Sequence, residues 1–325
     1  MRLLVLGGSA FVGRAVVEAA GRRGWQVSVF NRGTVAAPPG VEQLCGDRTS
    51  ESGLAVLAGR QWDAVIDTWR YAPRAVQLSC AALAGSVGHY GYVSSISAYA
   101  WPPLVPIRPD AKVVAPSADP DTEDYPQAKV GAERAILATF GDRTVLARAG
   151  LVLGPYEYAG RLPWWLLRYA RHDRVLAPLP IQRPVQYIDA RDLAEWLLDA
   201  AQAGRTGAFN LLCPRGHATM GQLLAACARA VGSPARTQWL PERQVLDGGV
   251  QPWVGLPLWL PEQDELAPMY DVEVSASLAA GLSCRPVAET VAQTWAWLNG
   301  KDPGPTGQHK PWLNRAHEVV LLDGP

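Results

Sequence analysis

The chain of 325 residues is poor in cysteine and histidine and has no excess of either charge. Thirty basic and thirty acidic residues, without long runs of one sign, lack the basic surface expected of a nucleic-acid-binding protein. The five cysteines are scattered and form no C-x-x-C pair, which argues against a disulfide framework and a zinc site, and the five histidines show no ligand spacing. We therefore expect a small-molecule substrate, no nucleic acid and no metal.

Long hydrophobic runs are also missing. No apolar run approaches the roughly 20 residues that span a membrane, and no charged leader with an apolar segment opens the chain. We expect a soluble cytoplasmic protein with reduced thiols and no membrane partner. A hydrophobic content of 48% and this length suffice for one large domain or two unequal ones.

Short apolar segments typical of strands alternate with helical stretches over the first half of the chain. The expected strands are Leu3–Leu6, Gln26–Phe30, Val41–Cys45, Ala64–Ile66, His89–Ser94 and Thr144–Ala149. Strands that alternate with helices imply right-handed crossovers and a parallel sheet covered on both faces. The sequence predicts an α/β fold with a doubly wound parallel sheet of the Rossmann type.

After about residue 150, proline, tryptophan and arginine become dense, which predicts a smaller and less regular second lobe. Segments 185–188, 192–202 and 208–211 look like returns to the first lobe. We expect a dinucleotide-binding domain over 1–150 plus about 185–215, and an interleaved C-terminal substrate lobe over 151–184 plus about 216–300. Residues 301–325 are expected to form a linker, rich in proline and glycine, and a C-terminal tail.

A glycine-rich motif follows the first expected strand and opens a helical stretch. Glycines at such a turn let the backbone approach a pyrophosphate, which accepts hydrogen bonds from amides at the helix N-terminus. Ala10 replaces the middle glycine of the G-x-x-G-x-x-G spacing, and a merely tight strand-to-helix junction is the alternative interpretation. The residues expected to bind a dinucleotide are Gly7, Gly8, Ser9, Ala10, Phe11, Val12 and Gly13.

The choice of nicotinamide cofactor depends on the end of the second strand, where a carboxylate would bind the ribose 2′-hydroxyl and repel a 2′-phosphate. Here the strand ends in Asn31 and Arg32. Since arginine pairs with phosphate through a planar fork, we expect NADP(H), with NAD(H) as the alternative if Arg32 is only a solvated loop charge. Asp47 is a candidate adenine contact and equally a turn residue. Asp67 and Thr68, after the fourth strand, are further expected cofactor contacts.

A second motif contains Tyr125, Pro126 and Lys129. A spacing of four places the tyrosine and the lysine on one helix face, where the ammonium would stabilise a phenolate. With 10 tyrosines and four lysines, this spacing arises by chance in roughly one such chain in eight. Pro126 suits the first helical turn, so Tyr125 is expected at the helix N-terminus, whose dipole also favours a phenolate. Tyr125 is thus a candidate general acid–base.

Hydroxyl groups gather at the end of the fifth expected strand, where open α/β sheets bind ligands. We expect Ser95 to hydrogen-bond the reacting oxygen, with Ser94 and Ser97 as alternatives. Ser94 is also an expected cofactor contact. The predicted catalytic residues are therefore Ser95, Tyr125 and Lys129.

With these motifs, the chain resembles the extended short-chain dehydrogenase/reductases of the NAD-dependent epimerase/dehydratase group over nearly its whole length. Two further segments carry the resemblance, Arg148–Pro155 and Val185–Ala194. The resemblance implies that the tyrosine is the acid–base, that the lysine binds the nicotinamide ribose and tunes the tyrosine, and that the serine orients the substrate. Leu151 is an expected cofactor contact, and packing of helices across a dyad is implied, giving a homodimer.

The glycine motif and Phe30–Gly33 are most similar to an actinobacterial reductase-like branch, and plastid stem-loop RNA-binding proteins are similar there too. We expect reduction of a ketone. Ile96 and Ser97 stand where a nucleotide-sugar 4,6-dehydratase resembling the family carries an Asp-Glu pair, which argues against dehydration. The alternatives are a nucleotide-sugar epimerase with tightly held NAD and a non-catalytic nucleotide- or RNA-binding relative.

Two sets of residues bear on the substrate. An epimerase would need a cation for the substrate pyrophosphate, and the candidates are Arg161, Arg168, Arg171, Arg174 and Arg183. Flat aromatic side chains favour a bulky, aromatic or polyketide-like substrate, although the hydrophobic core explains each of them equally well. These aromatic residues are Trp101, Trp164, Trp165, Trp239, Trp253 and Trp259.

Overall fold

The computed structural model describes residues 1–299 and 312–324, which form two compact units. Unit 1 comprises Met1–Gly150, Ala190–Leu212 and Glu273–Ser283. Unit 2 comprises Leu151–Asp189, Cys213–Val272 and the described residues from Cys284 onward. The expected linker at 301–311 lies outside the described residues.

Unit 1 is built on a seven-stranded parallel sheet with the strand order β10-β6-β5-β4-β1-β2-β3. The strands are β1 (Arg2–Leu6), β2 (Gln26–Asn31), β3 (Glu42–Cys45), β4 (Trp62–Asp67), β5 (Val87–Ser95), β6 (Thr144–Ala149) and β10 (Gly207–Leu211). The chain runs outward from β1 to β3 and then crosses back to β4. The direction reverses between β1 and β4, and the carboxyl ends of the strands at such a reversal are where folds of this type bind ligands. The predicted doubly wound fold is confirmed.

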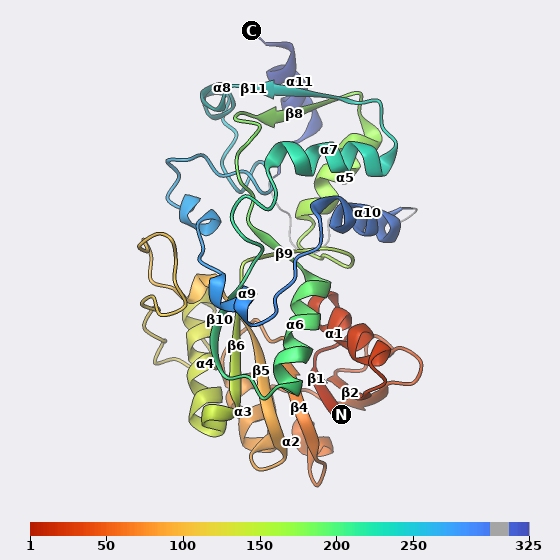
Figure 1. Ribbon diagram of the computed structural model, residues 1–325, viewed down its shortest axis with the longest axis vertical. Coiled ribbons are helices and arrows are strands. Elements are labelled where there is room, and N and C mark those ends of the chain that lie inside the picture. Colours follow the sequence, from red (N-terminus) through yellow and green to blue (C-terminus); the bar gives the residue numbers. More distant parts are fainter. Residues whose placement is uncertain (300–311, 325) are drawn as a thin grey trace. The chain divides into compact units, whose positions relative to one another are not determined.

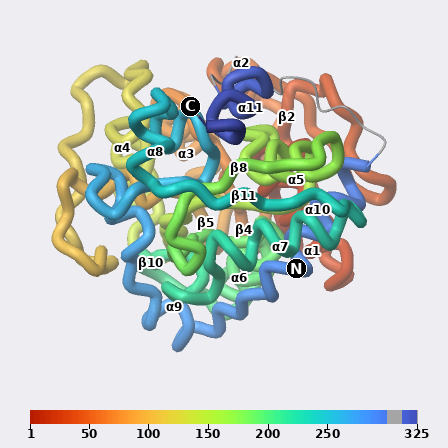
Figure 2. Tube along the Cα trace, turned by 90° about the horizontal axis from the view of Figure 1, so that it is seen from above, coloured from red at the N-terminus to blue at the C-terminus, as the bar shows by residue number. Residues whose placement is uncertain are grey.

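Helices cover both faces of this sheet. They are α1 (Phe11–Arg22), α2 (Glu51–Leu54), α3 (Arg74–Leu83), α4 (Tyr125–Phe140), α6 (Ala190–Gln202) and α9 (Ser275–Ala279). Helices α1 and α6 pack side by side on one face, whereas α3 and α4 pack together on the other, as Figure 1 and, from above, Figure 2 show. Because both faces are covered, the central strands are continuous apolar runs such as the fully buried Leu3–Val5. The described part of the chain contains no helix with the length and hydropathy of a transmembrane span.

Unit 2 has its own apolar core and two small parallel sheets. Strand β7 (Leu151–Leu153) pairs with β9 (Tyr187–Asp189), and β8 (Arg174–Pro178) pairs with β11 (Arg236–Leu240). The helices are α5 (Arg161–Arg171), α7 (Met220–Val231), α8 (Glu242–Asp247), α10 (Val287–Leu298) and α11 (Arg315–Asp323). The segment expected at 185–188 as a return to the first lobe instead contributes to β9, outside the seven-stranded sheet. A short apolar run does not specify which strand it pairs with.

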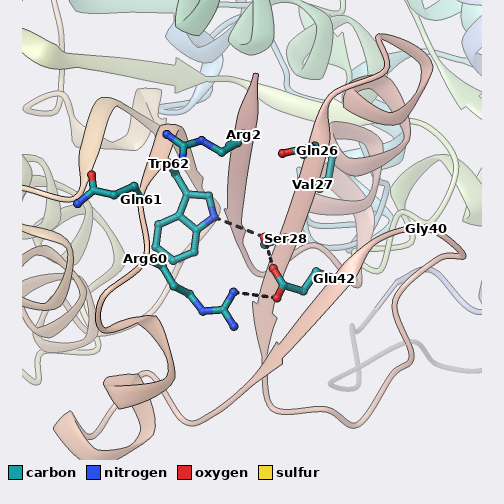
Figure 3. Close-up of a pocket in the computed structure, with 9 residues that line it drawn as sticks. All are labelled: Arg2, Gln26, Val27, Ser28, Gly40, Glu42, Arg60, Gln61 and Trp62. Atoms are coloured by element: carbon teal, nitrogen blue, oxygen red, sulfur yellow. Dashed lines mark hydrogen bonds and ion pairs between the residues drawn. The ribbon is translucent and has the colours of Figure 1, made fainter.

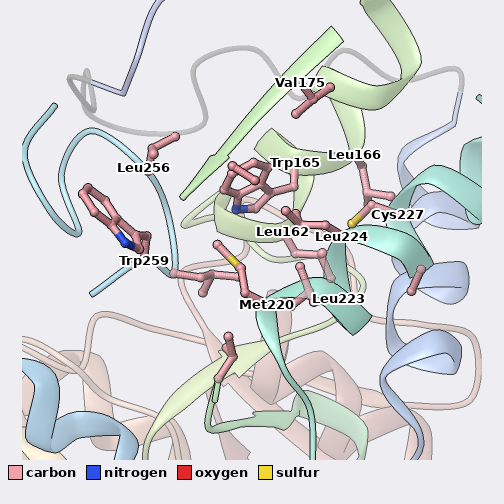
Figure 4. Packing of buried hydrophobic residues seen from close by; sticks show 14 of the residues in the cluster. Leu162, Trp165, Leu166, Val175, Met220, Leu223, Leu224, Cys227, Leu256 and Trp259 are labelled. Carbon is pink, nitrogen blue, oxygen red and sulfur yellow. The ribbon is translucent and has the colours of Figure 1, made fainter. Parts of the chain in front are cut away.

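The core of unit 2 lies between α5, α7 and the loop that follows α8. Trp165 and Trp259 are fully buried there, beside Leu162, Met220 and Leu223 (Figure 4). The indole nitrogen of Trp165 donates to the Pro257 carbonyl at 2.9 Å. These two tryptophans therefore serve the core rather than a substrate surface.

A buried carboxylate on helix α11 ties this helix to the rest of unit 2. Glu318 accepts a hydrogen bond from the Leu176 amide at 3.0 Å and pairs with Arg168 at 3.3 Å and Arg315 at 3.0 Å. The part of the expected C-terminal tail that the structure describes is thus a packed helix.

Candidate active site

The glycine motif forms a tight turn between β1 and α1. Gly7 has a φ of 121° and Gly8 a φ of 83°, a region that favours glycine. A Cβ atom on Gly13 would lie 2.6 Å from the Gly8 nitrogen, and one on Gly7 would lie 2.5 Å from Oγ1 of Thr68. Side chains are therefore excluded at these glycine positions, where the backbone forms the surface of the turn.

The first turn of α1 suits a bound anion. Its N-cap residue, Ala10, makes no side-chain capping hydrogen bond, and no acidic residue lies in the first turn. The helix dipole and the backbone amides at this end favour negative charge. Because the glycines also clear side chains from the turn, these residues fit the pyrophosphate of a dinucleotide.

Asn31 connects the end of β2 to the glycine motif. Its Nδ2 donates to Oγ of Ser9 at 2.7 Å, while its Oδ1 accepts from the Gly33 amide at 2.8 Å and from Nε2 of Gln43 at 3.0 Å. The side chain of Asn31 thus holds the turn, and the exposed Arg32 follows it directly in sequence.

Asp47 lies in the turn after β3. The backbone amide and hydroxyl of Thr49 donate to its carboxylate at 2.9 and 2.7 Å. These hydrogen bonds lower the pKa of Asp47, and the positive charge of Arg32 adds a smaller effect. The side chains of Arg32 and Asp47 are both exposed at the carboxyl edge of the sheet, and Asn31, the neighbour of Arg32, contacts the glycine motif.

Helix α4 begins at Tyr125, with Pro126 in its first turn as the sequence predicts. The helix is capped by Asp124, whose carboxylate accepts from the Gln127 amide at 2.9 Å. Tyr125 is 41% exposed, whereas Lys129, one turn later, is only 3% exposed. The Lys129 Nζ lies 5.7 Å from the centre of the Tyr125 ring. The structure thus places a buried amine beside a solvent-accessible phenol.

The Lys129 amine is enclosed by acceptors. Its Nζ donates to the carbonyl of Trp69 at 2.6 Å, to the carbonyl of Val93 at 2.8 Å and to the hydroxyl of Tyr92 at 3.1 Å. Burial lowers the pKa of Lys129 to about 7, although nearby carboxylates, Asp67 foremost, oppose this effect. The amine therefore changes charge near neutral pH.

The two serines at the end of β5 have different partners. The Ser95 Oγ accepts a hydrogen bond from the Ser97 amide at 3.1 Å, and its own hydroxyl proton is available to a ligand. Ser94 donates to Glu133 at 2.6 Å, and Glu133 in turn pairs with Arg148 at 2.8 Å. Ser95 is therefore the better placed of the two to bind a reacting oxygen, and its catalytic role stays a prediction.

Asp67, an expected cofactor contact, is fully buried in an ion pair. Both of its oxygens lie 2.8 Å from guanidinium nitrogens of Arg48, the Tyr90 hydroxyl donates to it at 2.8 Å, and the Trp69 amide donates at 2.9 Å. Arg48 holds the pKa of Asp67 below its usual value despite burial. These contacts fix Trp69, whose carbonyl binds Lys129. Sequence analysis missed Arg48, whose only signal is a charge beside the expected contact Asp47.

The remaining expected cofactor contacts lie in different units. Thr68, in unit 1, donates from Oγ1 to the Leu6 carbonyl at 3.0 Å and borders Gly7. Leu151 is buried in β7 of unit 2. Contact of either residue with a cofactor stays a prediction.

A cavity of about 430 Å³ lies at the amino-terminal ends of the strands, opposite the candidate site (Figure 3). Its lining includes Arg2, Gln26, Glu42 and Trp62, the first residues of β1, β2, β3 and β4. Arg60 pairs with Glu42 across it at 2.8 Å. Since the strands are parallel, this cavity is separate from the glycine turn and the Tyr125–Lys129 pair at the carboxyl edge.

Three solved structures share the fold of this chain. The Bordetella bronchiseptica enzyme WbmH in complex with NAD⁺ is 18% identical, with a TM-score of 0.72 over 92% of this chain and 98% of that chain. A UDP-glucose 4-epimerase is 15% identical, with a TM-score of 0.69 over 93% and 100%. WbmG from the same bacterium, in complex with NAD and UDP, is 16% identical, with a TM-score of 0.69 over 94% and 96%.

The fold defines a doubly wound α/β protein, and it carries the glycine turn and the Tyr125–Lys129 pair that the sequence predicts. The family model of the NAD dependent epimerase/dehydratase family matches residues 3–211, and the chain belongs to that family. Among curated proteins, none matches the chain in sequence. The resemblance inferred from the motifs is confirmed.

Proposed function

We propose that this enzyme reduces a ketone by hydride transfer from NADPH, with Tyr125 as the general acid. The observation that carries this proposal is the Tyr125–Lys129 pair, in which a solvent-accessible phenol at a helix N-terminus lies beside a buried amine. When bound, the nicotinamide cofactor supplies the hydride. The protein supplies the proton and holds the oxygen that receives it.

The chain's own residues divide this work. Gly7, Gly8 and Gly13 would hold the pyrophosphate at the N-terminus of α1. Ser95 would donate a hydrogen bond to the reacting oxygen, and Tyr125 would give that oxygen its proton. The ammonium of Lys129 and the dipole of α4 both stabilise the phenolate that remains.

The preference for NADP(H) is supported by Arg32. No carboxylate ends β2, and the side chain of Asn31 is occupied by Ser9, Gly33 and Gln43. Arg32 is exposed beside the glycine turn and offers a planar donor pair to a 2′-phosphate.

The proposed substrate is a ketone on a bulky, aromatic or polyketide-like molecule. Support comes from tryptophans that are only partly buried, whereas Trp165 and Trp259 lie wholly within the core of unit 2. Three of the partly buried ones, Trp164, Trp239 and Trp253, also pack against that core. The partly buried ones are Trp101, Trp164, Trp239 and Trp253.

A nucleotide-sugar epimerase with retained NAD is the second candidate. It is favoured by the shared fold of the UDP-glucose 4-epimerase and of WbmG, which was solved with NAD and UDP. Of the five arginines considered for a substrate pyrophosphate, three already form ion pairs within unit 2. These are Arg168 with Glu318, Arg174 with Asp323 and Arg183 with Glu242.

The deciding experiment is identification of the bound cofactor. The protein is purified without added nucleotide and denatured, any released nucleotide is identified by chromatography, and NADPH and NADH are then titrated. We expect no retained nucleotide and a dissociation constant for NADPH about tenfold or more below that for NADH, because a hydrogen bond between charged groups is worth about 1.5–3 kcal/mol. Retained NAD⁺ would instead establish the epimerase candidate.

Three variants sharpen this experiment. Arg32→Ala should weaken NADPH binding by about tenfold or more and leave NADH binding unchanged. Arg134→Ala, which removes an exposed arginine from α4, is the matched control and should leave both affinities unchanged. Tyr125→Phe should abolish NADPH-dependent reduction of aryl ketones while cofactor affinity is retained.

A further inference from the structure

The amine of Lys129 has three N–H donors when protonated, and the structure supplies three acceptors. They form a cage made of the Trp69 carbonyl, the Val93 carbonyl and the Tyr92 hydroxyl, at 2.6, 2.8 and 3.1 Å from Nζ. Two members of the cage are backbone atoms. Tyr92 is therefore the member of the cage that a substitution can remove.

Tyr92 contacts the amine in two ways. Its ring centre lies 4.6 Å from the Lys129 Nζ, close enough for a cation–π interaction. Its hydroxyl also donates to the Trp69 carbonyl at 3.1 Å. Burial, and then the negative charge of Asp67, raise the pKa of Tyr92 well above its ordinary value, so this hydroxyl keeps its proton. With that proton directed to Trp69, an oxygen lone pair of Tyr92 is left for the ammonium.

The Trp69 member of the cage is held by the buried Asp67–Arg48 ion pair. Asp67 accepts the Trp69 amide, and Arg48 lies 4.8 Å from the centre of the Trp69 ring. The indole nitrogen of Trp69 donates to the Ala72 carbonyl at 2.8 Å. The Trp69 carbonyl therefore cannot follow the amine if another acceptor is lost.

Four charges on neighbouring elements act on Lys129. Asp67 at the end of β4 and Glu133 on α4 favour the ammonium, whereas Arg70 and Arg48 in the loops after β4 and β3 oppose it. These contributions remain when the Tyr92 hydroxyl is removed, so the effect of that hydroxyl can be measured separately.

We propose that Tyr92 is a positioning residue that holds Lys129 beside Tyr125 and keeps its amine protonated. Phenylalanine at this position would retain the ring and remove the acceptor, leaving the buried ammonium two carbonyls. This inference rests on the role of Lys129 in the proposed function, but its test needs neither cofactor nor substrate.

The test is a titration of Lys129 by nuclear magnetic resonance in the cofactor-free, full-length protein labelled with ¹³C,¹⁵N-lysine. The chain has only four lysines, Lys112, Lys129, Lys301 and Lys310, so four Cε signals are expected, and the signal lost in Lys129→Met identifies the buried one. The wild-type midpoint should lie near the pKa of about 7. In Tyr92→Phe it should fall by about one pH unit, because a hydrogen bond to a charged group is lost.

Tyr99→Phe is the matched control. Tyr99 is a buried tyrosine of unit 1 whose hydroxyl donates to Asn210 at 2.6 Å instead of contacting Lys129. Its variant should leave the Lys129 midpoint unchanged. A Tyr92→Phe midpoint equal to that of the wild type overturns the proposal.

A second measurement uses the wild-type protein alone. With ¹³C-tyrosine, the Cζ signal of Tyr92 should shift with the same midpoint as the Lys129 signal, because the two groups are hydrogen-bonded. A Tyr92 signal that is insensitive to this titration contradicts the proposal, even if the Tyr92→Phe protein does not fold.

Activity separates this proposal from the proposed function. If ketone reduction is found, the alkaline limb of its pH profile should move down by about one unit in Tyr92→Phe, whereas a merely structural loss would lower turnover at every pH. Ketone turnover in Tyr92→Phe with an unchanged Lys129 midpoint and an unchanged alkaline limb supports the proposed reductase and refutes the role of Tyr92. A shifted Lys129 midpoint in a protein that reduces no ketone supports the role of Tyr92 and refutes the proposed reductase.

Discussion

The pH dependence of stability should report the burial of Lys129 directly. Burial lowers the pKa of this amine from 10.5 to about 7, a difference worth about 5 kcal/mol. The unfolded chain keeps the proton up to about pH 10, whereas the folded protein releases it near pH 7. The unfolded state binds more protons between these values, so this amine makes the free energy of unfolding rise with pH there.

Lys129→Met removes the titrating group and keeps a side chain of similar length. The variant lacks the stabilisation that the wild-type protein gains as pH rises. The free energy of unfolding of the variant minus that of the wild type should therefore be largest at or below pH 7. This difference should decline by about 1.4 kcal/mol per pH unit up to about pH 10.

The assay is urea unfolding of both proteins at a series of pH values. Lys112→Met, at an exposed position, is the control and should give a curve parallel to that of the wild type. A Lys129→Met curve that is also parallel to the wild-type curve would refute the reasoning, because the buried amine would then titrate as it does in the unfolded chain.

Two further predictions follow from the contacts of unit 1. Gly13→Ala should weaken cofactor binding at least about tenfold in a fluorescence titration, because its Cβ would lie 2.6 Å from the Gly8 nitrogen; unchanged affinity would show that the turn does not bind the pyrophosphate. Asp67→Asn should lower the free energy of unfolding by about 3–5 kcal/mol, because Arg48 stays buried without its counter-charge. The control, Arg2→Ala, breaks an exposed ion pair and should lower the free energy of unfolding by at most about 1 kcal/mol. An equal loss of stability in Asp67→Asn and Arg2→Ala would contradict burial as the cause.

The main sheet could be predicted from the sequence because its strands are buried on both faces. Leu3–Leu6 is apolar throughout and Thr144–Ala149 is buried at every position, and their bounds match β1 and β6 to within one residue. The start of α4 at Tyr125 was equally predictable, because Pro126 favours the first helical turn.

The surroundings of Lys129 could not be predicted in this way. Two of its three acceptors are the carbonyls of Trp69 and Val93, and any residue type could supply them. Their positions depend on how β4 and β5 pair, which side-chain patterns do not specify. The burial of Trp165 and Trp259 was similarly hidden, because aromatic residues are typical of both cores and binding surfaces.

The carboxylate of Glu318 also orders events during synthesis of the chain. Arg168 and the Leu176 amide receive this partner only after α11 has left the ribosome, later than every segment of unit 1. The segments of unit 1, by contrast, are complete at Ser283. A nascent chain can therefore assemble its seven-stranded sheet while still tethered, whereas a message with a premature stop codon before Glu318 yields a protein in which Arg168 and the Leu176 amide lack this partner.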